Sequence, residues 1–189
     1  MMISFFIRLL SKIISRQIDR IIANHPNRET VLSWIQRNNA EDICSYFDFA
    51  LLESTYIVET ENVPNIPIPK FFCWFFDSDA IEDWNEMEAQ GITLKDTIFI
   101  HKDDCYDWVV FHELVHAVQW RSLGDIDFIF TYGILLFVFS YDDHPLEQIA
   151  YDRENWYEKR VMKKIEGCID SHALEQRDSL RIMLTDEVL

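Results

Sequence analysis

The stretch WVVFHELVHAVQW at residues 108–120 decides the fold of this chain, because it places three ionisable side chains inside a largely apolar run. His112 and His116 are four residues apart, and Glu113 directly follows the first histidine. Residues four apart lie on the same face of an α-helix, so both imidazoles can approach one metal ion. Burying two imidazoles and a carboxylate is costly unless something pairs with them. A zinc ion would supply that pairing; the alternative is a core helix with two satisfied histidines.

Length and composition indicate one compact domain. The chain has 189 residues, of which 49% are hydrophobic, with only 4 glycines and 5 prolines. A chain of this length can bury a sizeable core, and its few turn-forming residues favour helices over many short strands. We expect an α+β, helix-dominated domain with a small β-sheet over residues 29–189, preceded by an amphipathic helix within residues 1–28.

The charge and the cysteines exclude several classes of protein. The net charge of −16 argues against nucleic acid as a partner, which would need a basic face. Residues 1–28 hold five basic residues and one aspartate, a balance of +4, so the remainder carries −20. The 4 cysteines form no Cys-x-x-Cys pair, which argues against a disulfide framework and a cysteine zinc knuckle.

The N-terminal segment is an amphipathic helix by its charge pattern. Basic residues recur at every fourth position, at Arg8, Lys12, Arg16 and Arg20, and so lie on one helical face. They interrupt the apolar residues, so we expect neither a cleavable signal peptide nor a membrane span, and a cytoplasmic location. Residues 3–22 could contact an anionic membrane surface peripherally, or pack their apolar face on the domain. The sequence leaves both open.

Three further segments frame the histidine helix. ITLKDTIFIHK at 92–102 is rich in β-forming residues and predicts a strand. The segment at 125–141 predicts a core helix interrupted or bent at Gly133, too short to cross a bilayer. The segment at 144–167 predicts a long, partly exposed helix that begins at Pro145.

A third metal ligand is expected downstream of the histidine helix. The candidates are His144, Glu147 and, less favoured, Asp142 or Asp143. We favour Glu147, because Pro145 primes a helix whose first turn would project this carboxylate into the cleft. His144 precedes the helix start and is the alternative.

The segment FHELVHAVQWRSLG, followed about thirty residues later by HPLEQIAY, resembles the gluzincin branch of zinc metallopeptidases. It is most similar to the small bacterial group with an H-E-L-x-H-x-x-Q helix and a later Pro-x-Glu-x-x-Ala segment. The match covers roughly residues 92–155. The resemblance implies a zincin-like domain, zinc bound by His112, His116 and Glu147, and Glu113 as the general base.

The function expected from this resemblance is hydrolysis of peptide bonds in a peptide or protein substrate by a zinc-activated water. Tyr141, Tyr151 and His144 are candidates for stabilising the oxyanion or for orienting a ligand. Thermolysin-like gluzincins carry an aspartate four residues beyond the glutamate ligand, where this chain has Tyr151. Either Tyr151 or Asp152 could take the place of that aspartate as the partner of a ligating histidine.

Two further interpretations follow. In zincin-like folds the strand before the active helix lies at the sheet edge, so residues 93–100 are expected to pair with an extended peptide, unless they form an interior strand. The alternative function is a non-catalytic, zinc-stabilised membrane-surface or partner-binding protein. The basic face of the N-terminal helix and the aromatic run at 128–141 motivate this alternative.

Overall fold

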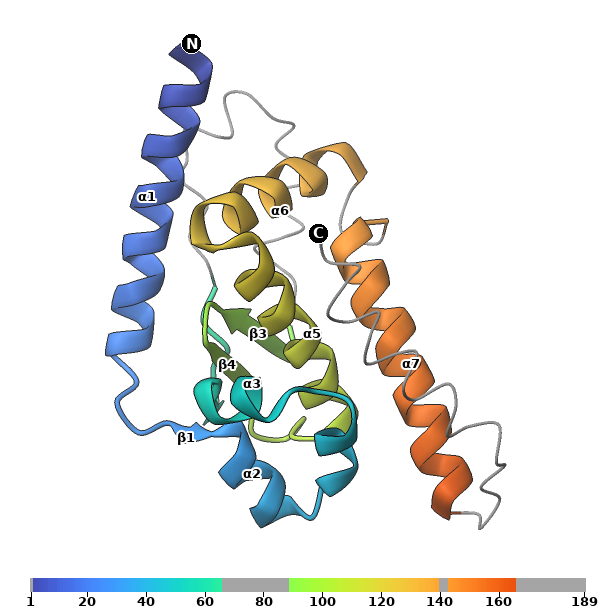
Figure 1. Ribbon diagram of the computed structural model, residues 1–189. Coiled ribbons are helices and arrows are strands. Elements are labelled where there is room, and N and C mark those ends of the chain that lie inside the picture. Colours follow the sequence, from blue (N-terminus) through green and yellow to red (C-terminus); the bar gives the residue numbers. More distant parts are fainter. Residues whose placement is uncertain (1, 66–88, 140–142, 166–189) are drawn as a thin grey trace.

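The computed structural model describes residues 2–65, 89–139 and 143–165, and it has the helix-dominated α+β class predicted from the sequence (Figure 1). The helices are α1 (Met2–Ala23), α2 (Val31–Asn38), the short 3₁₀ helix η1 (Glu41–Ser45), α3 (Phe49–Ser54), α5 (Asp107–Leu123), α6 (Asp125–Phe139) and α7 (Pro145–Ile165). The strands are β1 (Glu29–Thr30), β2 (Tyr56–Thr60), β3 (Gly91–Leu94) and β4 (Thr97–His101).

The four described strands form one mixed sheet in the order β1-β2-β4-β3. β2 and β4 are parallel, and β1 and β3 are antiparallel to their neighbours. The single strand expected at 92–102 is therefore wrong, since it is a hairpin of β3 and β4 joined at Lys95 and Asp96. Lys95 has the left-handed φ of 59° that usually calls for glycine, so the turn carried no recognisable signal. Within the described sheet, β3 is an edge strand and β4 an interior one.

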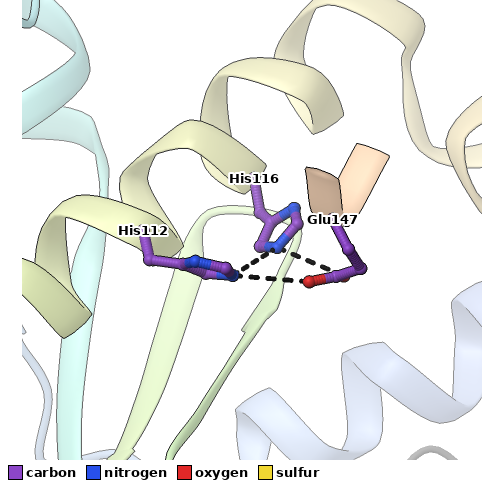
Figure 2. Close-up of side chains that lie close together, drawn as sticks. All are labelled: His112, His116 and Glu147. Atoms are coloured by element: carbon purple, nitrogen blue, oxygen red, sulfur yellow. Dashed lines mark hydrogen bonds and ion pairs between the residues drawn. The ribbon is translucent and has the colours of Figure 1, made fainter. Parts of the chain in front are cut away.

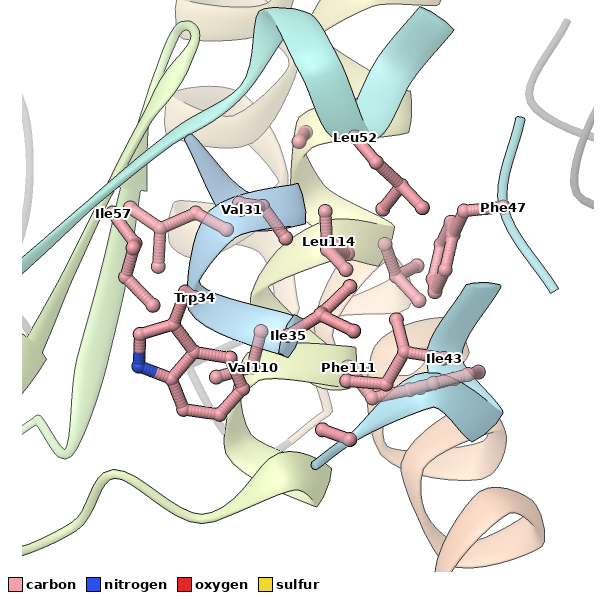
Figure 3. Close-up of a cluster of buried hydrophobic side chains, with 14 of the residues drawn as sticks. Val31, Trp34, Ile35, Ile43, Phe47, Leu52, Ile57, Val110, Phe111 and Leu114 are labelled. Atoms are coloured by element: carbon pink, nitrogen blue, oxygen red, sulfur yellow. The ribbon is translucent and has the colours of Figure 1, made fainter. Parts of the chain in front are cut away.

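Helix α5 lies at the centre of the core, between the sheet and α7. It contacts β3, β4, α6 and α7, and almost every residue from Val109 to Trp120 is buried. Figure 3 shows Val110, Phe111 and Leu114 of α5 packed against side chains from α2 and η1. Packing on several sides fixes the helix axis and rotation, so the directions of its polar side chains are fixed as well.

Helix α1 packs on the domain through its second half. Ile14, Ile18, Ile21 and Ile22 join a hydrophobic cluster with Trp120 and Phe128, and Ile18 is fully buried. Lys12, Arg16 and Arg20 are exposed on the other side of the helix. Along residues 11–22, the apolar face of α1 therefore packs on the domain. This was one of the two expectations for the helix; the other was contact with a membrane surface.

Helix α6 runs unbroken through Gly133, so it is not interrupted there, which was one of the two alternatives expected at this residue. Phe128 in its first half is buried, whereas Ile134 is 42% and Phe139 43% exposed. Among the α6 side chains whose burial the structure describes, the contacts with the core come from the half nearest α5. Among the residues that the structure describes, no helix combines the length and apolar character needed to cross a membrane.

Candidate metal centre

Three buried side chains from two helices converge on one point (Figure 2). His112 and His116 project from successive turns of α5, and Glu147 from the first turn of α7, just after Pro145. The two Nε2 atoms are 3.1 Å apart. Oε2 of Glu147 lies 3.4 Å from Nε2 of His112, and Oε1 of Glu147 lies 3.3 Å from Nε2 of His116. His112, His116 and Glu147 are only 7%, 6% and 3% exposed.

The outer nitrogen of each imidazole has its own partner. Nδ1 of His112 lies 2.8 Å from a carboxylate oxygen of Glu154, two turns beyond Glu147 on α7. Nδ1 of His116 lies 2.8 Å from Oε1 of Gln119. The amide group of Gln119 is oriented by its nitrogen, which donates to the Leu146 carbonyl at 3.2 Å. Both Nδ1 atoms therefore donate a proton outward, as is usual for ligating histidines.

This arrangement brings the lone pairs of the two Nε2 atoms and of the Glu147 carboxylate close to one another. In a neutral imidazole whose Nδ1 donates, Nε2 carries a lone pair. Two such nitrogens and the Glu147 carboxylate then face one another within 3.4 Å in a buried site. Such a cluster is unstable without a proton or a cation at its centre.

The size of the cluster fits a small cation with nitrogen and oxygen ligands. Ligand atoms at 2.0–2.1 Å from a tetrahedral zinc ion lie about 3.3 Å apart. The contacts among His112, His116 and Glu147 have about that length, with each histidine facing a different carboxylate oxygen. Two histidines and one glutamate leave a fourth position open, as in catalytic rather than structural zinc sites. The residues present can therefore hold a metal ion of this kind.

Without a metal, the cluster holds protons. Burial alone would lower the pKa of His112, but hydrogen bonds to Glu147 and Glu154 raise it to about 10. The pKa of His116 is also raised, because the charge of Glu147 outweighs burial. Burial opposes ionisation of Glu147, but the two histidines hold its pKa far below the usual range. A metal ion would have to displace these protons.

Glu113 lines the same cavity as the three clustered residues, beside them rather than among them. The hydroxyl oxygen of Thr93, on β3, lies 2.7 Å from its Oε2 and 2.8 Å from its backbone oxygen. Gly91, at the start of β3, approaches the same carboxylate so closely that an added Cβ would lie 2.9 Å from Oε1. Burial raises the pKa of Glu113 above its ordinary value. The edge strand therefore fixes where this carboxylate points.

Helix α6 contributes a residue that the sequence did not reveal. Tyr132 donates its hydroxyl proton to Oε1 of Glu147 at 2.6 Å. The backbone oxygen of Tyr132 lies 3.0 Å from Nε2 of His144, whose Nδ1 accepts from the Leu146 amide at 3.2 Å. Burial lowers the pKa of His144, which suits a neutral ring that donates on one side and accepts on the other. His144 thus ties α6 to the start of α7 and does not join the metal-ligand cluster.

The other predicted residues fall in different places. The ring of Tyr151 lies 4.7 Å from that of His112 and is 39% exposed, while Asp152 is exposed. The partner of His112 is Glu154, three residues beyond Tyr151. Tyr141 lies outside the described residues. A helical spacing of seven from Glu147 to Glu154 was the available signal for this contact, because residues seven apart share a helix face.

A scan against protein-family models and searches of curated proteins and of solved structures gave no match to this chain.

Proposed function

We propose that this chain is a zinc-dependent metallopeptidase with a zincin-like domain. His112, His116 and Glu147 would hold the zinc ion, and Glu113 would act as the general base. The observation that carries the proposal is the buried triangle of two Nε2 atoms and one carboxylate, with Glu113 lining the same cavity. Glu154 and Gln119 support it, because each holds one imidazole with its inner nitrogen directed into the triangle.

Each residue of the site has a role in peptide hydrolysis. A zinc ion held there would polarise the substrate carbonyl and make a water molecule more acidic. Glu113 would accept a proton from a water molecule as the oxygen of that water adds to the carbonyl carbon. The carbon–nitrogen bond then breaks, and Glu113 passes the proton to the leaving amine. Thr93 holds the Glu113 carboxylate in position through its hydroxyl.

The edge strand favours a peptide as substrate. β3 pairs with β4 on one side within the described sheet and lies against α5. An extended chain can add to such an edge through main-chain hydrogen bonds. The Trp120 indole already donates to the Thr93 carbonyl at 3.0 Å, so that carbonyl is occupied. A substrate peptide would therefore pair with the Gly91 end of β3.

A non-catalytic zinc-stabilised protein is the alternative. The role on a membrane surface motivated by α1 is weakened for residues 11–22, because their apolar face is covered by α5 and α6. Peripheral membrane contact through residues 3–22 stays a prediction.

Zinc content tests the ligand assignment, with Glu147→Ala and His144→Ala as a matched pair. Both residues are buried and are three positions apart, but only Glu147 joins the triangle. We expect one zinc per wild-type chain, far less in Glu147→Ala and near wild-type content in His144→Ala, measured by elemental analysis after equal zinc loading. Loss of zinc in His144→Ala with retention in Glu147→Ala would contradict the assignment.

A further inference from the structure

Helix α6 contacts both α5 and α7, the two helices that carry the clustered residues, and Tyr132 is its link to the cluster. The Tyr132 hydroxyl donates to Oε1 of Glu147 at 2.6 Å. Bonds from a hydroxyl to an ionised carboxylate have lengths of about 2.5–2.7 Å and are about twice as strong as bonds between neutral groups. Glu147 is only 3% exposed, so bulk water competes little for this bond. The bond can therefore fix the direction of the carboxylate.

The ring and the backbone of Tyr132 are themselves held in place. Its ring centroid lies 4.2 Å from that of His144 and 5.6 Å from that of Phe128. Phe128 in turn stacks on Trp120 of α5 at 4.1 Å. The backbone oxygen of Tyr132 lies 3.0 Å from Nε2 of His144, which directly precedes α7. Groups on both sides of α6 thus determine where the hydroxyl points.

The Glu147 side chain needs such a support if it is to bind a metal ion. The first turn of α7 fixes its Cα and Cβ, but three side-chain torsion angles still decide where the carboxylate lies. Oε2 lies 3.4 Å from Nε2 of His112, and Oε1 lies 3.3 Å from Nε2 of His116. Rotation about the Cγ–Cδ bond would change both distances at once. A donor at Oε1 opposes that rotation.

We propose that Tyr132 is a positioning residue of the metal site: its hydroxyl holds the Glu147 carboxylate in the orientation that binds the ion. The proposal rests on the zinc site proposed above and extends that site to α6. Glu154 of α7 and Gln119 of α5 hold the two histidines in the same way. Each of the three proposed ligands therefore has a supporting partner, and the three partners come from three different helices.

Tyr132→Phe tests this role, because it keeps the ring and removes the hydroxyl. Tyr157→Phe is the matched control, since the Tyr157 hydroxyl also donates to a carboxylate, that of Asp107, at 3.1 Å. Asp107 is not one of the three clustered residues. Competition with a chromophoric chelator measures the zinc affinity of wild type and of both full-length variants. Cobalt(II) is then loaded in place of zinc, because its visible spectrum reports the number and arrangement of its ligands.

We expect Tyr132→Phe to bind zinc about 10- to 100-fold more weakly than wild type, the usual effect of removing the partner of a metal ligand. Its cobalt spectrum should also differ from that of wild type, whereas Tyr157→Phe should match wild type in both measurements. Wild-type zinc affinity or a wild-type cobalt spectrum in Tyr132→Phe would overturn the positioning role and leave the zinc peptidase standing. Equal changes in the two variants would do the same. A wild-type chain that binds no zinc would overturn both proposals.

Discussion

Gly91→Ala probes the contact between the edge strand and the proposed general base. The new Cβ would lie 2.9 Å from Oε1 of Glu113, 3.1 Å from its Cγ and 3.2 Å from its Cδ. An ordinary contact begins near 3.4 Å, so the carboxylate must move by about 0.5 Å. It cannot retreat freely, because Thr93 holds Oε2 at 2.7 Å and the side chain is buried.

A displacement of this size has two measurable effects. Misplacing a catalytic group by about 1 Å costs about 100-fold in rate, so about 0.5 Å is expected to lower kcat about 10-fold. Zinc content should be unchanged, because the nearest atoms to the new Cβ belong to Glu113 and not to the three clustered residues. The crowding should cost about 1 kcal/mol of unfolding free energy, after the gain from replacing a strand glycine.

Gly133→Ala is the matched control, since a Cβ there meets no atom within 4 Å and Gly133 lies inside α6. It should stabilise the fold by about 0.5–1 kcal/mol and leave turnover unchanged. Urea unfolding and peptide turnover of the two zinc-loaded variants provide the comparison. Equal stabilisation by both substitutions, or wild-type turnover in Gly91→Ala, would refute the argument from close approach.

Two other predictions concern the surroundings of the metal. Glu154→Ala should weaken zinc binding about 10- to 100-fold, because His112 loses the acceptor for its Nδ1 proton, whereas Glu158→Ala, exposed one turn further along α7, should not. Competition with a chromophoric chelator measures both, and equal affinities in the two variants would show that Glu154 does not position His112. Zinc affinity should also rise with pH. Burial lowers the pKa of His112, but its hydrogen bonds to Glu147 and Glu154 raise this pKa to about 10. Below that pH, zinc must displace a proton from His112 in order to bind. The expected slope is about tenfold per pH unit for each proton displaced, and an affinity that stays constant between about pH 7 and pH 9 would contradict it.

The placement of the two histidines was predictable from the sequence because its geometry is local. The spacing of His112 and His116 places them on one helical face wherever the helix lies, and Pro145 marks the start of the helix that presents Glu147. The helix-dominated class followed from composition in the same way. The contact of Glu147 with the two histidines depends on how α7 packs on α5. Local helix geometry does not establish that contact, and the resemblance to gluzincins supported Glu147 over His144.

The remaining contacts depend on tertiary packing. Tyr132 contacts Glu147 because α6 packs against α7, and the residue pattern of neither helix predicts that contact. The sequence pattern predicts one strand in place of the β3–β4 hairpin, because Lys95 adopts a positive φ without glycine. His144 lies close to Glu147 in the sequence, but its ring hydrogen-bonds backbone groups of α6 and α7. The sequence alone does not distinguish this role from metal ligation.

The measurement that tests the central claim most directly is peptide turnover by zinc-loaded Glu113→Gln beside wild type. The substitution keeps the size of the side chain and the three clustered residues, but removes the base that accepts the proton. Zinc content should stay at the wild-type value, and turnover should fall by about 10²–10⁴-fold. Equal cleavage rates for the two proteins, with zinc bound in both, would contradict the assignment of Glu113 as the general base.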